Sequence, residues 1–121
     1  PAVFARQILN DEPLYVTEGR KRDLTYIDDV VAGVMAATQR QFAFEIFNIG
    51  RGEPQSLHEL VAALSRAAHK TPRIEAREAP EGELTITYAN IDKAREMLGY
   101  NPKVSLAEGA QRLMDWMKTQ P

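Results

Sequence analysis

Residues 42–49, FAFEIFNI, constrain the fold more than any other segment of this 121-residue chain. The segment is apolar at both odd and even positions, apart from Glu45 and Asn48. Successive side chains of a strand point to opposite faces, so this pattern predicts a strand that is covered on both faces. Strands of that kind occur in parallel sheets that lie between helices. Gly50 and Gly52 end the predicted strand.

The residues before this strand alternate between helical and extended patterns. Apolar spacing predicts an opening helix that ends at residues 10–13, and then strands over residues 14–17 and 22–27. Gly19 supplies the turn of the hairpin that these two strands are expected to form. Asp28 or Asp29 is expected to cap the next helix. The predicted buried face of that helix consists of Val30, Val31, Val34 and Met35.

The residues after the central strand carry several helix signals. Ser56 and Glu59 form a capping box, and Ser105 and Glu108 form a second one before the final helix. A strand is predicted over residues 73–78, followed by a loop over residues 79–88 and a short helix that Asn90 caps. The predicted fold class is α/β, with a small mixed sheet, a hairpin and about four to five helices.

Composition excludes several classes of function. The chain has 15 Lys and Arg against 17 Asp and Glu, a net charge of −2, which argues against nucleic acid as a main partner. It has no Cys, so it has no disulfide framework and no thiolate metal site, and this suits a cytoplasmic protein. No apolar run is long enough to cross a bilayer, and no signal peptide is recognisable. We expect residues 1–121 to form a single domain.

A basic cluster at Arg20, Lys21 and Arg22 is the main candidate for a binding site. In a strand, Arg20 and Arg22 share one face and Lys21 takes the other. A guanidinium group forms paired hydrogen bonds with phosphate oxygens, which suits a diphosphate ligand. A solvated strand end explains the same charges without any ligand, and charge alone favours that explanation.

The other polar residues give weaker signals. Capping explains Asp28 and Asp29 better than a catalytic carboxylate pair does. Neither His58 nor His69 has a partner at the spacing of metal ligands, so we assign no metal. The glycines at positions 50 and 52 lack the third glycine of a dinucleotide-binding loop, and a turn explains them.

Four blocks of sequence, taken in order, resemble the C-terminal part of the extended short-chain dehydrogenase/reductase family, which contains NAD-dependent nucleotide-sugar epimerases and dehydratases. Residues 22–31 (RDLTYIDDVV) resemble the family's RDFTYVDD block, and residues 47–50 (FNIG) resemble its YNIG block. Residues 82–83 and 89–94 resemble its PGD and ADxSKA blocks. Residues 98–102 (LGYNP) and 105–109 (SLAEG) resemble its closing signature. Within the family, UDP-glucuronate 4-epimerases are the nearest subgroup.

The resemblance implies that this chain is a substrate-binding C-terminal domain of a Rossmann-type enzyme, an isomerase or lyase. In the family, an N-terminal NAD-binding Rossmann domain carries the cofactor loop and a catalytic Tyr-x-x-x-Lys pair. Neither occurs here, which implies that this chain alone binds no cofactor and has no catalytic residue. The implied partners are that N-terminal domain, with its NAD, and a UDP-sugar.

The resemblance also implies which residues bind the nucleotide sugar. Arg22 matches the family arginine that contacts the diphosphate. Pro80 stands where some members have a second such arginine, and Arg77 is the candidate to replace it. Glu83 matches a position in the loop next to the substrate, and Tyr26 is a further pocket candidate, although core packing also explains it.

Two alternatives belong to other functional classes. The chain could be a stand-alone α/β module that binds a ligand without catalysis. It could also be a fragment that self-associates into a homo-oligomer through an apolar face that a missing sheet leaves exposed.

Overall fold

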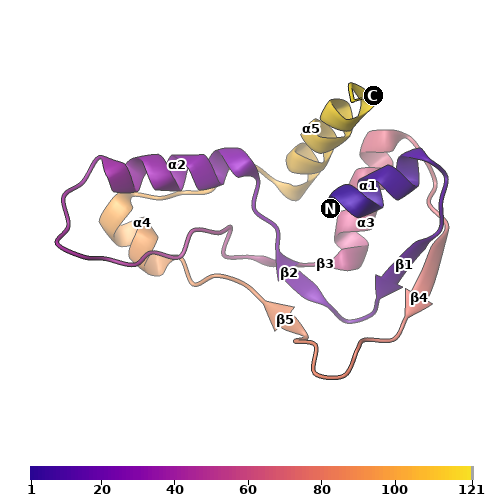
Figure 1. Cartoon of the computed structure of the whole chain (residues 1–121), viewed down its shortest axis with the longest axis horizontal. Helices are drawn as coiled ribbons and strands as arrows, with labels where there is room; N and C mark the ends of the chain where they lie inside the picture. Colours follow the sequence, from indigo (N-terminus) through magenta and orange to yellow (C-terminus); the bar gives the residue numbers. More distant parts are fainter. Residues whose placement is uncertain (121) are drawn as a thin grey trace.

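The computed structural model describes residues 1–120, which form five helices and five strands (Figure 1). The helices are α1 (Ala2–Leu9), α2 (Ile27–Thr38), α3 (Leu57–Ala68), α4 (Asp92–Leu98) and α5 (Leu106–Lys118). The strands are β1 (Leu14–Thr17), β2 (Lys21–Asp23), β3 (Pro54–Ser56), β4 (Ile74–Arg77) and β5 (Ile86–Thr87). This arrangement confirms the α/β class with a small mixed sheet.

The main hydrophobic core lies between α1, α3 and α5 and the inner face of β1, at one end of the molecule (Figure 1). Leu14 and Val16 of β1 are fully buried, as are Leu64 of α3 and Met114 of α5. The capping box of Ser56 and Glu59 is present at the start of α3 as predicted. In α5 only half of the predicted box forms, because Ser105 accepts the N–H of Glu108 while the Glu108 side chain pairs with Arg112.

The predicted hairpin between β1 and β2 is wrong, because the two strands belong to different sheets. β1 pairs in parallel with β4, with Leu14 opposite Ile74. β2 lies at the centre of a three-stranded sheet, antiparallel to β3 and parallel to β5. Gly19 does make a turn, at a φ of +68°, but the turn carries the chain from the first sheet to the second. The buried face of β1 packs on the helices, which fixes the strand there.

The orientation of α2 differs from the prediction. Val31, Val34 and Met35 are exposed by 51–53%, whereas Asp29 and Gly33 are the buried residues of the helix. Gly33 lies against Ile49 and Tyr100, where a β-carbon would come within 2.9 Å and 3.1 Å of their side-chain atoms. A residue without a side chain is therefore what lets α2 approach this part of the chain.

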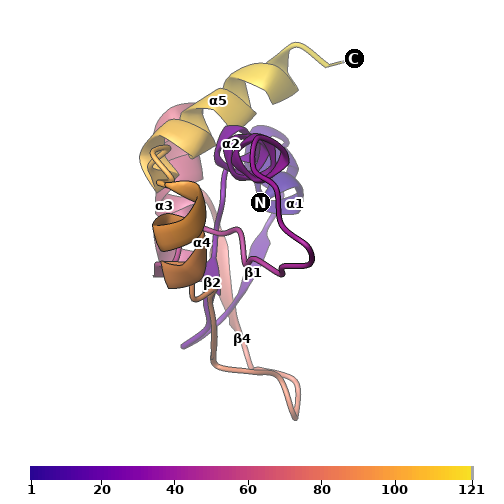
Figure 2. The same ribbon diagram turned by 90° about the vertical axis from the view of Figure 1, so that its left-hand side faces the viewer.

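Residues 42–49 do not form the predicted strand. The segment runs irregularly from the end of α2 back toward the centre of the molecule (Figures 1 and 2). Phe47 and Ile49 pack against a second, smaller core around α4, but Phe44 and Ile46 are 79% and 67% exposed. Within residues 1–120, no other strand pairs with this segment.

Candidate functional site

Two members of the basic cluster, Arg20 and Arg22, converge on one carboxylate, that of Glu83. The Arg22 Nη2 atom lies 2.9 Å from Glu83 Oε1, and the Arg20 Nε atom lies 3.6 Å from Glu83 Oε2. Arg22 Nη1 donates to the carbonyl oxygens of Lys21 and Thr85, at 2.8 Å and 3.4 Å, so one side of the guanidinium group is anchored to backbone. The prediction that Arg20 and Arg22 share a face is therefore confirmed.

Arg22 lies at an open groove of about 350 Å³. The walls of the groove come from β2, β5 and the glycine loop that follows residues 42–49. Its lining residues are Arg22, Asp23, Thr25, Ile49, Gly50, Thr87, Tyr88 and Ala89. A cationic side chain, a hydroxyl group and an aromatic ring at one groove are a suitable set for a ligand that has both an anionic and a ring-shaped part.

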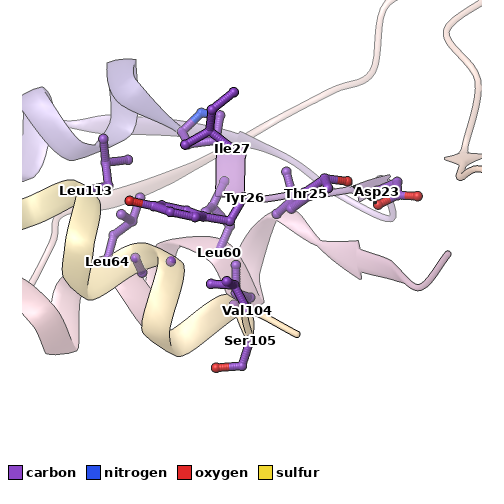
Figure 3. A pocket seen from close by; sticks show the side chains of 14 residues that line it. Asp23, Thr25, Tyr26, Ile27, Leu60, Leu64, Val104, Ser105 and Leu113 are labelled. Atoms are coloured by element: carbon purple, nitrogen blue, oxygen red, sulfur yellow. Dashed lines mark hydrogen bonds between the residues drawn. The ribbon is translucent and has the colours of Figure 1, made fainter. Parts of the chain in front are cut away.

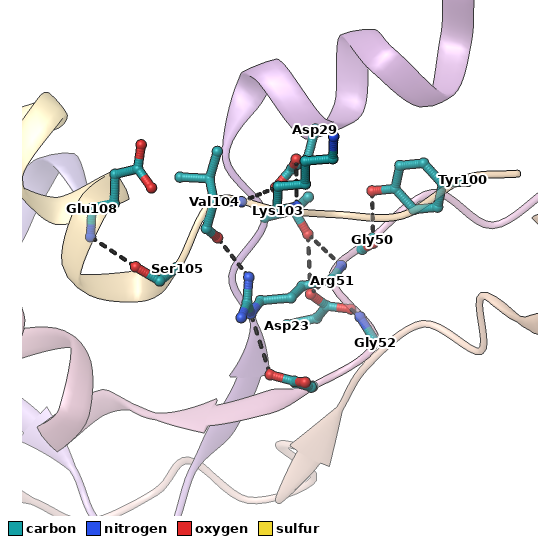
Figure 4. A network of polar contacts seen from close by, with 12 residues as sticks. Asp23, Asp29, Gly50, Arg51, Gly52, Tyr100, Lys103, Val104, Ser105 and Glu108 are labelled. Carbon is teal, nitrogen blue, oxygen red and sulfur yellow. Dashed lines mark hydrogen bonds and ion pairs between the residues drawn. The ribbon is translucent and has the colours of Figure 1, made fainter. Parts of the chain in front are cut away.

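Asp23 holds the walls of this groove together (Figure 4). Its Oδ1 accepts hydrogen bonds from the Arg51 N–H at 2.9 Å and the Thr25 hydroxyl at 3.0 Å. Its Oδ2 accepts from the N–H groups of Gly52 and Ala89, at 3.0 Å and 3.1 Å. Burial by itself raises the pKa of Asp23, but the backbone donors of Ala89, Gly52 and Arg51 together with the Thr25 hydroxyl outweigh it and lower the pKa below the ordinary 3.8.

A second carboxylate, Asp29, fastens α2 to the segment before α5 (Figure 4). It is 6% exposed and accepts the N–H groups of Lys103 and Val104 at 2.8 Å and 2.9 Å. The prediction that Asp28 or Asp29 caps α2 is wrong: the N-cap residue is Tyr26, without a side-chain hydrogen bond, and Asp28 pairs with Arg112.

Tyr100 completes the polar network beside these carboxylates. Its buried hydroxyl group donates to the Gly50 carbonyl at 2.8 Å (Figure 4). Burial raises the pKa of Tyr100, and the negative charges of Asp29 and Asp23 raise it further. No local pattern indicates the contacts of Asp23 with distant backbone groups, of Asp29 with the segment before α5, or of Tyr100 with Gly50, because they join residues far apart in the chain.

Tyr26 faces a different cavity from Arg22. This cavity has a volume of about 390 Å³ and is mainly apolar, and the Tyr26 ring lies toward Leu64 and Leu113 in it (Figure 3). The ring also lies 5.3 Å from the Arg112 guanidinium carbon. These contacts correspond to the packing role that the sequence left open for Tyr26.

The structure places the remaining candidates as follows. Arg77 is exposed at the end of β4, in the other sheet, and no hydrogen bond or ion pair within residues 1–120 joins it to Arg22. Asn90 accepts the N–H of Asp92 at 3.0 Å, but the N-cap residue of α4 is Ile91, without a side-chain hydrogen bond, so the prediction that Asn90 caps this helix is wrong. His58 pairs with Glu18 at 3.0 Å on the surface.

No group of three or more His, Cys, Asp or Glu side chains in residues 1–120 could hold a metal ion. None of the helices in this range combines the length and the apolar character that crossing a bilayer requires.

The chain is similar to nucleotide-sugar epimerases both in sequence and in structure. No protein-family model matches the chain. A UDP-glucuronate 4-epimerase from Thermodesulfobacterium geofontis is 31% identical over 118 residues, which are 95% of this chain and 36% of that protein. A UDP-glucuronic acid 4-epimerase from Bacillus cereus, solved with UDP-glucuronic acid and NAD, matches 95% of this chain with a TM-score of 0.85 and 34% identity. A UDP-glucose 4-epimerase from Thermotoga maritima, solved with UDP-glucose, matches 96% of it with a TM-score of 0.86 and 28% identity.

The matched part is a minority of each relative. The chain spans 35% and 36% of the length of two curated relatives, and it covers 38% of each of the two solved chains. It reproduces their fold across that part, which confirms the small α/β architecture.

Proposed function

We propose that this chain, which matches the C-terminal part of UDP-glucuronate 4-epimerase-like NAD-dependent epimerases, is the portion that binds the nucleotide sugar in such an enzyme. In this proposal residues 1–121 act as one substrate-binding domain. The preceding part of the enzyme supplies NAD and the residues that oxidise and reduce the sugar, so this chain does not catalyse the reaction alone.

The convergence of Arg20 and Arg22 on one carboxylate is the observation that carries the proposal. Two guanidinium groups that share a face and meet a single anion, one of them lining the groove, provide the charge and the donors that a diphosphate needs. Arg22 offers the better geometry, because its Nη1 is already fixed by two carbonyl oxygens while Nη2 faces the anion.

Glu83 takes the place of that anion in this structure, so a diphosphate has to compete with it. The Glu83 side chain is 34% exposed and belongs to the loop between β4 and β5, so it can leave without breaking a buried contact. We therefore assign Glu83 a role as the counter-ion of Arg22 when no substrate is bound. Tyr26 and Arg77 have no role in this proposal, because they line other surfaces.

The glycine loop of this chain does not fit the pyrophosphate of NAD. A dinucleotide loop needs backbone N–H groups that are free to bind the pyrophosphate. In the glycine loop of this chain, the N–H groups of Arg51 and Gly52 both bind the Asp23 carboxylate instead. The loop therefore serves the groove as a wall, and we place NAD entirely in the preceding part of the enzyme.

Calorimetry with UDP and UDP-glucuronic acid tests the proposal on the full-length protein. Arg22→Ala removes the central cation, and Arg6→Ala removes the same charge from the exposed face of α1 as a matched control. A charge-assisted hydrogen bond contributes about 1.5–3 kcal/mol, so Arg22→Ala should raise Kd by about tenfold or more. Equal Kd values for the two variants, or no binding of either nucleotide by the parent protein, would contradict the proposal.

A further inference from the structure

Arg20 is more enclosed than Arg22, and one of its donor groups has no hydrogen-bond partner. The Arg20 side chain is 14% exposed, against 28% for Arg22. Its Nε atom is shielded from water and forms no hydrogen bond within residues 1–120. The distance of 3.6 Å to Glu83 Oε2 is that of an ion pair and is too long for a hydrogen bond. The fold therefore encloses a guanidinium group whose Nε–H still lacks an acceptor.

The two arginines depend on Glu83 to different degrees. Arg22 Nη1 donates to two backbone carbonyl oxygens, so this guanidinium group keeps two acceptors when Glu83 leaves. Arg20 has no such acceptor at its Nε, and Glu83 is the one acidic side chain that pairs with it within residues 1–120. A largely buried charge is costly when it has no partner. A ligand that displaces Glu83 therefore has to supply an anionic group to Arg20 as well as to Arg22.

The two arginines also lie at different places along the groove. Arg22 is a lining residue of the groove, whereas Arg20 is not one in the part of the chain that the structure describes. Arg20 directly precedes β2, and residues two apart in a strand are separated by roughly 7 Å, so Arg20 lies one step outside the groove. Glu83 reaches both cations with separate oxygen atoms, Oε1 at Arg22 and Oε2 at Arg20. An anionic ligand that takes its place has to extend from one arginine to the other.

Charge balance favours a ligand with two anionic groups. Glu83 carries a single negative charge, and it faces the positive charges of two guanidinium groups. A ligand with two linked phosphates can give each guanidinium group its own phosphate oxygens. A single phosphate at Arg22 would displace Glu83 and leave the Arg20 Nε–H without an acceptor.

We propose that Arg20 and Arg22 bind adjacent phosphates, and that Arg20 makes the site select a nucleoside diphosphate over a nucleoside monophosphate. Arg22 holds the phosphate at the groove, and Arg20 holds the next one. This inference rests on the proposed function, and it deepens that function by assigning the recognition of the second phosphate to one residue.

Calorimetry with UMP and UDP on the full-length protein tests the proposal, because these two probes differ only in the second phosphate. The parent should bind UDP at least about tenfold more tightly than UMP, since the second phosphate adds a charge-assisted hydrogen bond. Arg20→Ala should raise the Kd of UDP by about tenfold and that of UMP by less than about twofold, so that most of the preference for UDP disappears. Arg22→Ala should raise both Kd values.

Two further variants separate a ligand contact from a packing effect. Arg20→Lys keeps the charge but not the planar fork of donors, so it should retain part of the preference for UDP. Arg20→Gln keeps much of the length of the side chain without its charge, and it gives the same test if Arg20→Ala does not fold. Binding of UMP by each variant shows that the groove itself is intact.

Two results would overturn the role of Arg20. One is an increase in Kd by the same factor for UMP and UDP in a folded Arg20→Ala or Arg20→Gln variant, which would mean that both arginines hold the same phosphate. The other is no change in either Kd. If Arg22→Ala still weakens UDP binding in these cases, the proposed function stands and the inference about Arg20 alone fails. A parent protein that binds neither nucleotide would refute the proposed function itself.

Discussion

Replacing Asp23 with Asn keeps the shape of the side chain but removes half of its acceptor capacity. One oxygen can still accept from Arg51 and Thr25, but the new NH₂ group faces the N–H groups of Gly52 and Ala89, which then lack an acceptor. An N–H group that loses its acceptor costs about 1–3 kcal/mol when it is buried. Because the groove beside Asp23 is open to water, the lower part of that range applies, and we expect Asp23→Asn to lower the free energy of unfolding by about 2–3 kcal/mol in total.

Urea unfolding followed by far-ultraviolet circular dichroism measures this loss. Thermal unfolding followed by the same signal should show a decrease in Tm of about 8–12 °C, which corresponds to about 2–3 kcal/mol for a chain of this size. Asp28→Asn is the matched control, because it removes the same charge from an exposed side chain that pairs only with Arg112. Exposed ion pairs contribute little to stability, so the free energy of unfolding of the control should be close to that of the parent.

The pH dependence gives a second measurement of the same contacts. The pKa of Asp23 is lower in the folded chain than its ordinary value of 3.8. Its contribution is therefore fully present above that value and is lost as the pH falls through the lower, folded value. Asp23→Asn should be less sensitive to acid than the parent in this range. The reasoning would be refuted if Asp23→Asn and Asp28→Asn unfolded at the same urea concentration, or if the acid transition did not change.

Two other substitutions test separate parts of the structure. Glu83→Gln removes the charge that competes for Arg22, so calorimetry should show UDP binding about two- to fivefold more tightly, whereas weaker binding would show that Glu83 contacts the ligand itself. Gly33→Val places methyl groups where Ile49 and Tyr100 already lie, and thermal unfolding should show a loss of about 2 kcal/mol or more. The control, Ala32→Val on the exposed side of α2, should cost much less, and equal losses would mean that helix propensity rather than packing is responsible.

Local signals predicted the helices well, because the residues that cause them are close in sequence. The reciprocal hydrogen bonds of Ser56 and Glu59 join residues three positions apart, and Gly99 ends α4 at a φ of +67°. The shared face of Arg20 and Arg22 follows from strand alternation alone, so this part of the site could also be predicted.

Pairings between distant segments could not be predicted in this way. The short turn at Gly19 was typical of a hairpin, but β1 finds its partner in β4, which follows it by more than fifty residues. Asp29 had the sequence context of a helix cap and instead binds backbone groups at positions 103 and 104. The predicted buried face of α2 is wrong for the same reason: Asp29 and Gly33 are its buried residues, because their partners lie at positions 49, 100, 103 and 104.

Every strand pair in the structure joins a strand that ends before residue 24 to one that begins after residue 53. The backbone contacts of Asp23 and Asp29 likewise join residues on opposite sides of residues 42–46. A protease that cuts the backbone within residues 42–46 would therefore release no fragment: the two pieces would travel together through a gel-filtration column and separate only in a denaturing gel. Strand pairing and hydrogen bonds hold the parts of the chain before and after residues 42–46 together, so their association does not require the peptide that links them.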